Sequence, residues 1–359
     1  MPLFEAASIK SVALHRVGNK ATEEGYVLSE KPIQLSEPLQ DLLVRYFLTP
    51  FKVEEYYHFS HEEHIEENPL HRCCEQIFAN PESLMEESCE VARLLYEAST
   101  HPNIKGGELF VVYFSECQLG GETTEAIGIF KSETQEKFLR VMHDEEQWSR
   151  EEGDMSARGQ YRLEVQLGIN PGKLDKGAIV FNLEGEKGYI VSAIDATNRS
   201  TDALYWKDAF LRLRQREDEY FNTHTEMQAY KKFVTDELPE KFEDVSKADQ
   251  ADMLNRCSNY FKQNDNFDLQ TFTEEVIAQP EVIDQFKEYR QRYQEEYDVQ
   301  MPESYDISED AVKKQARAYK SVIKLDRNFH IYVHGDRDLI EQGEDEKGKF
   351  YKVYYHEES

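Results

Sequence analysis

The sequence has no long hydrophobic run, no linker rich in proline or serine, and no repeat of solenoid period. Its longest apolar runs, such as Leu109 to Phe114, are far shorter than the ~20 residues of a membrane-spanning helix. Residues 1–16 lack a basic segment followed by an apolar block and a small-residue cleavage site. We therefore expect no signal peptide and a cytoplasmic protein.

Cysteine is scarce and shows no spacing typical of a disulfide framework or a zinc ribbon. The five cysteines are Cys73, Cys74, Cys89, Cys117 and Cys257. An odd number without a CxxC pair favours reduced thiols in the core or at the surface. Redox activity of the adjacent pair Cys73 and Cys74 is the less favoured alternative.

The motifs of several common enzyme classes are also missing. The glycine-containing segments GGELF and LGGETT match neither GxxxxGK[ST] nor GxGxxG, and we interpret them as turns before strands. There is no GxSxG motif, and the acidic segment HDEEQWSREEGD lacks the frame of a calcium-binding loop. These absences favour a protein that is not an enzyme and that uses no cofactor.

One segment rich in histidine and glutamate leaves a metal site open as an alternative. On a helix, His61 and His64 would lie one turn apart and could share a metal ion with Glu67 or Glu54, close to His58. The HExxH spacing fails, however, because an isoleucine replaces the second histidine. We favour a solvated acidic loop without a metal ion, and a metal-dependent enzyme is the third functional hypothesis.

Positive charge is in short supply, with 42 Lys and Arg against 71 Asp and Glu and a formal net charge of -29. Such a charge repels duplex DNA at long range, although salt screens the repulsion beyond ~8–10 Å. Any binding of nucleic acid therefore depends on local clusters of cations.

Apolar material, by contrast, is sufficient for two folded domains. The chain of 359 residues is long for one core, and its forty-three aromatic residues can fill two. We predict an N-terminal α+β domain at 1–200 and a C-terminal, mainly helical domain at 201–359.

Hydrophobic periodicity predicts an α+β fold. Segments such as 8–17, 107–114 and 176–183 are typical of strands, whereas 82–100 places its apolar residues on one helical stripe. We expect a mostly antiparallel sheet with packed helices in the first domain. The second domain is expected to be helical and to end in short strands, with a terminal β-hairpin at 339–355.

A predicted helix at 281–297 has a continuous stripe of large side chains. The stripe consists of Val282, Phe286, Tyr289, Tyr293 and Tyr297. Packing within the core of one chain is the favoured use of this stripe. The alternative is an interface in a homodimer, because two-fold symmetry is the commonest form of self-association.

Five segments occur in an order that resembles a known family. They are ALHRV, GGELFVVYF, LDKGAIVFNL, LYWKDAFLRLRQRED and IKLDRNFHIYVHG, and they resemble the bacterial nucleoid-associated protein family of the NdpA/YejK type. The resemblance covers nearly the whole chain and rests on hydrophobic patterns, without a catalytic signature. It implies a bacterial cytoplasmic protein that is found with the nucleoid. The segment HDEEQWSREEGD has no place in this pattern.

The first cluster of cations is KDAFLRLRQRED, which contains Arg212, Arg214 and Arg216. We expect a helix whose buried stripe consists of Trp206, Phe210, Leu213 and Phe221. At ~100° per residue, Lys207 and Arg214 fall on one flank of that stripe, and Arg212 and Arg216 fall on the other. Two interpretations suit cations on both flanks of a helix. They form salt bridges to nearby carboxylates, or they contact two rows of phosphates in a nucleic-acid backbone.

The second cluster runs from Lys313 to Arg327 and has a local charge of +5, with Asp326 as its one acid. Ser308 is the predicted N-cap of a helix that continues to about Tyr319. Solvated surface and phosphate contact are almost equally good explanations of these cations. The predicted phosphate contacts of the two clusters are Arg212, Arg214, Arg216, Lys313, Lys314, Arg317, Lys320 and Lys324.

Two main functions follow. The first is sequence-indifferent binding of double-stranded DNA through the local basic patches of a nucleoid-associated protein. The second is an acidic interaction module that docks onto DNA-bound proteins, with carboxylates that partly imitate the charge of DNA. Either function suits a cytoplasmic protein that forms a homodimer and has no membrane partner.

Overall fold

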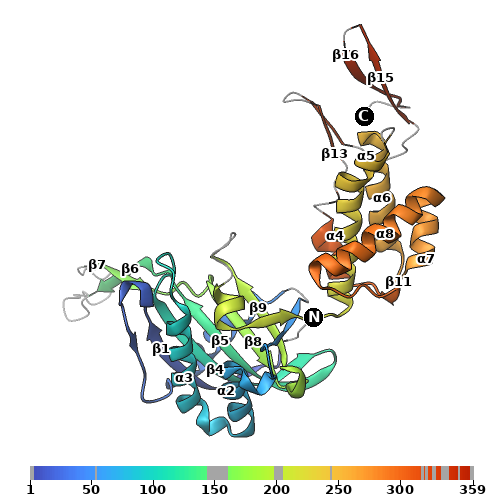
Figure 1. Cartoon of the computed structure of the whole chain (residues 1–359). Coiled ribbons are helices and arrows are strands. Elements are labelled where there is room, and N and C mark those ends of the chain that lie inside the picture. Colours follow the sequence, from blue (N-terminus) through green and yellow to red (C-terminus); the bar gives the residue numbers. More distant parts are fainter. Residues whose placement is uncertain are drawn as a thin grey trace. The chain divides into compact units, whose positions relative to one another are not determined.

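The computed structural model describes residues 4–52, 55–143, 161–197, 205–242, 245–316, 319, 322–325, 329–332, 339–346 and 348–355. The chain forms two units, unit 1 at Met1–Gln215 and unit 2 at Arg216–Ser359 (Figure 1). The sequence predicted a domain boundary between residues 200 and 201. The division lies later in the chain because the described residues 205–215 pack with unit 1.

An antiparallel sheet of eight strands forms the centre of unit 1, in the spatial order β10-β3-β9-β8-β5-β4-β1-β2 (Figure 1). Its strands are β1 (Ser8–Val17), β2 (Tyr26–Val27), β3 (Tyr56–Phe59), β4 (Gly107–Leu119), β5 (Glu122–Ser132), β8 (Lys176–Phe181), β9 (Ile190–Asp195) and β10 (Leu213–Gln215). The antiparallel sheet predicted from alternating and apolar segments is confirmed.

Helices cover both faces of this sheet. On one face, α2 (Pro69–Ala79) and α3 (Leu84–Ala98) pack against it. On the other, α1 (Glu37–Leu48) places Phe47 on Phe130 of β5, with ring centroids 4.3 Å apart. Successive strand residues point to opposite faces, so an apolar run such as GELFVVYF in β4 fills both cores.

The turn between β4 and β5 shows why the sequence predicts this hairpin. Gly120 and Gly121 both have positive φ, at 59° and 85°. A two-residue turn of this kind matches the twist of the flanking strands, and glycine adopts its backbone angles without a Cβ clash.

Two further strands of unit 1 form a hairpin that is not part of the eight-stranded sheet. They are β6 (Glu136–His143) and β7 (Tyr161–Gly168), which form an antiparallel pair over their whole length. The hairpin extends beyond the helices that cover the main sheet (Figure 1).

Unit 2 is mainly helical. Its helices are α4 (Glu219–Lys232), α5 (Leu238–Lys241), α6 (Lys247–Gln263), α7 (Leu269–Phe272), α8 (Pro280–Tyr297) and α9 (Glu309–Gln315). Its strand pairs are β11 (Asn266–Asp268) with β12 (Ser304–Asp306), β13 (Val322–Leu325) with β14 (Phe329–Tyr332), and β15 (Ile340–Asp345) with β16 (Gly348–Val353). The α+β fold class, including the terminal hairpin, is confirmed.

The tyrosine-bearing stripe of α8 packs largely inside unit 2. Val282, Phe286 and Tyr293 are buried, and Phe286 contacts the ring of Tyr230 at 5.4 Å between centroids. Tyr297 at the end of the stripe is 45% exposed. The structure thus agrees with the core interpretation of the stripe. Among the described residues, no helix has the length and apolarity to cross a membrane.

Candidate nucleic-acid interface

The first cluster of cations does not lie on one helix, which corrects the sequence prediction. The π-helix Tyr205–Phe210 ends before Arg212, whose backbone is left-handed with φ 51°. The chain then enters β10, which pairs with β3 and places Arg214 opposite His58. The opposite flanks expected for these cations therefore do not exist.

The predicted apolar stripe is divided between the two units. Trp206 and Phe210 are buried in unit 1, and Leu213 packs against the same core. Phe221, in contrast, belongs to α4 of unit 2. The spacing of these residues imitates a helix, but pairing with β3 offers the backbone hydrogen bonds of a strand after Arg212.

Arg212 and Arg214 are exposed and line one open cavity of about 880 Å³ beside the edge strand β10. The carbonyl oxygen of Arg212 accepts hydrogen bonds from the backbone N–H of Ser60 at 2.8 Å and from its Oγ at 2.9 Å. Glu62 and Asp208 line the same cavity and reduce its positive charge. The structure therefore brings two of the three predicted arginines together, whereas Arg216 is the first residue of unit 2.

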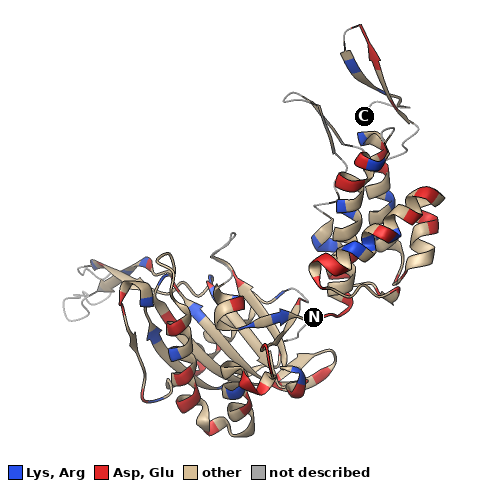
Figure 2. Ribbon diagram, in the orientation of Figure 1, with Lys and Arg blue, Asp and Glu red and all other residues tan. Residues whose placement is uncertain are grey.

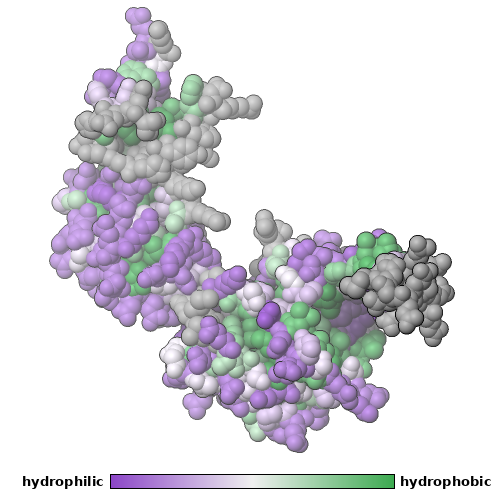
Figure 3. Space-filling view, turned by 180° about the vertical axis from the view of Figure 1, so that it is seen from behind, coloured by the Kyte–Doolittle hydropathy of each residue, from purple (hydrophilic) through white to green (hydrophobic). Residues whose placement is uncertain are grey.

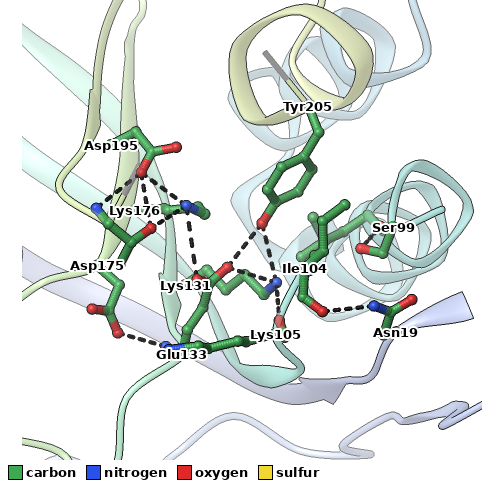
Figure 4. Close-up of polar contacts among 12 residues, drawn as sticks. Asn19, Ser99, Ile104, Lys105, Lys131, Glu133, Asp175, Lys176, Asp195 and Tyr205 are labelled. Carbon is green, nitrogen blue, oxygen red and sulfur yellow. Dashed lines mark hydrogen bonds and ion pairs between the residues drawn. The ribbon is translucent and has the colours of Figure 1, made fainter. Parts of the chain in front are cut away.

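A buried ionic network lies at the start of the π-helix (Figure 4). The Lys131 Nζ atom is 3.0 Å from Glu133 Oε1 and donates to the carbonyl oxygen of Lys105 at 2.6 Å. It also lies 3.2 Å from the Tyr205 hydroxyl group, which donates to Glu133 at 2.9 Å. The Lys131 side chain is fully buried, and that of Glu133 is 5% exposed.

A second buried lysine extends the network. Lys176 Nζ is 2.8 Å from Asp195 Oδ1 and 3.8 Å from Glu133 Oε2, and it donates to Thr197 Oγ1. Asp175 accepts from the backbone N–H of Glu133 at 2.6 Å. Buried ions need this kind of pairing, because the loss of water from a charged group is otherwise expensive.

Burial sets the protonation of this network. Burial lowers the pKa of the Lys131 ammonium group, and the Glu133 carboxylate acts in the opposite direction. For Tyr205, burial and then the Glu133 charge raise the pKa of the hydroxyl group far above 10. Tyr205 is therefore protonated at neutral pH and can donate to Glu133.

The network connects the π-helix to the ends of three strands. Lys131 and Lys176 lie at the end of β5 and the start of β8, and Asp195 ends β9. Tyr205 is the first residue of the π-helix. The network thereby fixes the segment that continues to Arg212, and π-helical turns occur frequently near functional sites.

The second cluster begins on α9 of unit 2. Ser308 caps this helix, because its Oγ accepts from the N–H of Ala311 at 3.3 Å, as the sequence predicted. Lys313 and Lys314 are both exposed. Lys313 Nζ is 2.9 Å from Glu309 Oε2, an exposed pair that contributes little to stability and can exchange for a phosphate.

Lys262 joins this surface and was missed by the sequence analysis. It is exposed near the end of α6, and it lines a cavity of about 430 Å³ together with Lys313. Asp265 and Glu309 line the same cavity and offset the charge of the two lysines. Lys262 is distant from the cluster in sequence, and its neighbour Asp265 hides any local excess of charge. Only the packing of α6 against α9 brings it to the same surface as Lys313.

The rest of the second cluster is only partly described. Arg317 and Lys320 lie outside the described residues. Lys324 lies in β13, where it is paired with His330 in the register of the hairpin. These positions therefore stay predictions.

Negative charge is shared evenly by the two units. Unit 1 contains 22 Lys and Arg against 37 Asp and Glu, and unit 2 contains 20 against 34, so their formal charges are -15 and -14. In both units the cations lie among acids (Figure 2). Any binding of DNA therefore depends on local groups of exposed cations such as those on α6 and α9.

The histidine segment does not form the helix on which the metal hypothesis depended. His58 lies in β3, with Nδ1 2.8 Å from the carbonyl oxygen of Tyr189. His61 follows this strand, and His64 directly precedes the short 3-10 turn Ile65–Glu67. Within the described ranges, which exclude position 54, no group of three or more His, Cys, Asp or Glu is arranged to hold a metal ion.

The fold and the exposed cations define a two-unit α+β protein of acidic overall charge with small groups of exposed cations. A family model described as nucleoid-associated protein YejK matches residues 13–350. The chain therefore belongs to this family of nucleoid-associated proteins, and the resemblance found in the sequence is confirmed. A comparison with curated proteins finds no match.

Proposed function

We propose that this protein associates with the nucleoid by binding the phosphate backbone of duplex DNA without sequence preference. The observation that carries this proposal is the group of exposed lysines on α6 and α9 of unit 2 in a member of this family. Lys262 and Lys313 share a cavity there, and Lys314 is the next residue along α9. Lysine acts on phosphate as a point charge, which suits binding that is independent of base sequence.

The remaining predicted cations would extend this contact. In unit 1, Arg212 and Arg214 on the β10 cavity form a second phosphate site. The other proposed contacts are Arg216, Arg317, Lys320 and Lys324. Arginine forms bidentate hydrogen bonds with phosphate, so two neighbouring arginines can bind the DNA backbone in spite of nearby carboxylates.

A titration of duplex DNA at several salt concentrations tests this function. Four to six phosphate contacts give a slope of log affinity against log salt of about -4 to -5, because each contact releases counterions. Replacing Lys313, Lys314 and Arg317 by glutamine should flatten the slope by about two to three. The loss should be the same for every DNA sequence, since phosphates carry no base information.

A matched control removes three other cations of unit 2, with the same change in net charge. Lys241, Lys287 and Lys349 are exposed and are not proposed contacts. Their replacement by glutamine should leave the slope almost unchanged. Equal slopes for the wild type and the first triple variant, or no binding by the wild type at ~50 mM salt, would contradict direct DNA binding.

The acidic charge of both units supports a second candidate function. Carboxylates exposed on units with formal charges of -15 and -14 can bind basic surfaces of DNA-bound proteins. In this case the pure protein fails to bind DNA but binds DNA that is already coated with a basic protein. The same titration with and without such a coat separates the two functions.

A further inference from the structure

The hairpin of β6 and β7 has one face that is almost entirely apolar. In the antiparallel register, Leu139 lies opposite Val165, and Val141 lies opposite Leu163. Residues directly opposite each other point to the same side of a hairpin. Lys137 and Leu167 form the next pair along this face, and Tyr161 lies on the same side of β7 as Leu163.

This apolar face is exposed to solvent. Its six large apolar residues have exposed fractions of 58–69%, and they are Leu139, Val141, Tyr161, Leu163, Val165 and Leu167. The opposite face contains polar residues such as Arg140, Glu164 and Gln166. Figure 3 shows hydrophobic surface of unit 1 that borders the undescribed residues drawn in grey.

An uncovered face of this kind is unfavourable in a hairpin of two strands. Such a hairpin is marginally stable in water unless its apolar face packs against something else. The six residues expose on the order of 700 Å², above the ~300–600 Å² of the largest patch on a typical monomer. The value is close to the ~800 Å² that each partner buries in an interface of standard size.

We propose that this face packs against the same face of a second copy of the chain. The four central residues alternate as leucine and valine on both strands, with Leu139 and Leu163 at diagonal positions. When two such faces meet, a two-fold axis parallel or perpendicular to the strands places each leucine over a valine of the other copy. The bulky and small side chains then interdigitate, as a closed isologous dimer requires.

Electrostatics also favours this face for self-association. Two copies with a formal charge of -29 each repel one another over most of their surfaces. The seven described side chains of the apolar face include no acid, and Lys137 is the one Lys or Arg among them. Contact through this face therefore avoids the repulsion between carboxylates and does not depend on the proposed DNA binding.

The test is the mass of the protein in sedimentation velocity, with two variants that place the same charge on opposite faces. Val165→Glu introduces an acid on the apolar face, and Gln166→Glu introduces it on the polar face one residue later. We expect twice the chain mass of 42.1 kDa for the wild type and Gln166→Glu, and 42.1 kDa for Val165→Glu. A monomeric wild type, or a dimeric Val165→Glu, would overturn the proposal.

Val165→Glu could also become monomeric because the hairpin unfolds, and a second measurement separates this explanation from the loss of an interface. In a Cys89→Ser background, which removes the one cysteine that is not buried, Val165→Cys and Gln166→Cys are labelled with a maleimide. The labelling rate at position 165 should fall severalfold as protein concentration rises, whereas the rate at 166 should stay constant. Equal rates at both positions, unchanged by concentration, would also overturn the proposal.

Discussion

Two lysines of unit 1 are fully buried, which is unusual for this residue type. Lys131 and Lys176 share the carboxylate of Glu133, and each has a further partner in the network. Their burial could not be predicted from the sequence, because Glu133 follows β5 but Asp195 lies at the end of β9. Only the order of the strands in the sheet shows that these charged side chains are neighbours.

The network makes a prediction about a single residue. Glu133→Gln removes the charge that faces both ammonium groups and leaves them incompletely paired in the core. We expect a loss of about 3–5 kcal/mol in the free energy of unfolding, as for other broken ion pairs in protein interiors. Urea denaturation followed by circular dichroism measures this loss.

The control is an exposed ion pair in the same unit. Glu90→Gln disrupts the pair of Glu90 with Arg93, in which both side chains are about half exposed. Its urea midpoint should match that of the wild type, because exposed pairs contribute little. A similar midpoint for Glu133→Gln would mean that the buried network does not stabilise unit 1.

At the scale of elements, local signals were sufficient where the structure depends on local interactions. Two adjacent glycines predicted the β4–β5 turn, and an apolar stripe predicted α8. Ser308 before two acids predicted the start of α9. No local pattern predicted the end of the π-helix, because β10 forms by pairing with β3, which lies far earlier in the sequence. Lys262 could not be predicted for the same reason, because only the packing of α6 against α9 brings it to the same cavity as Lys313.

The left-handed backbone of Arg212 provides a test that separates function from stability. A non-glycine residue in this conformation costs ~1–2 kcal/mol, and glycine does not bear that cost. Arg212→Gly should therefore retain the hydrogen bonds to Ser60 and raise the free energy of unfolding by up to about 1 kcal/mol. If Arg212 contacts a phosphate, the salt slope of DNA binding should flatten by about 0.9.

Arg212→Gln is the matched control, since it removes the same charge but keeps the strained backbone. It should flatten the salt slope equally and should not raise stability. A slope that is unchanged in both variants would show that Arg212 makes no phosphate contact. The strained conformation would then serve only to direct the chain into β10.

At the scale of the whole molecule, the proposed phosphate contacts belong to two acidic units. Arg212 and Arg214 belong to unit 1, whereas Lys313 and Lys314 belong to unit 2. A protein of this charge binds DNA usefully only when several local contacts act on one duplex, because each contact alone is opposed by the surrounding carboxylates. The proposed contacts of Arg212 and Arg214 therefore predict that both units contribute to the same complex.

Three variants test this prediction. The first replaces Arg212 and Arg214 by glutamine, the second replaces Lys313 and Lys314, and the third combines all four changes. If both units contact one duplex, each pair should flatten the salt slope by about 1.8 and the combination by about 3.6, because counterion release is additive over phosphate contacts. The slopes are obtained from fluorescence anisotropy of a labelled duplex, with thermal denaturation to verify folding. If the unit 1 pair has no effect while the unit 2 pair retains its own, DNA binding belongs to unit 2 alone. In that case the charges of Arg212 and Arg214 would only offset those of Glu62 and Asp208 in the β10 cavity.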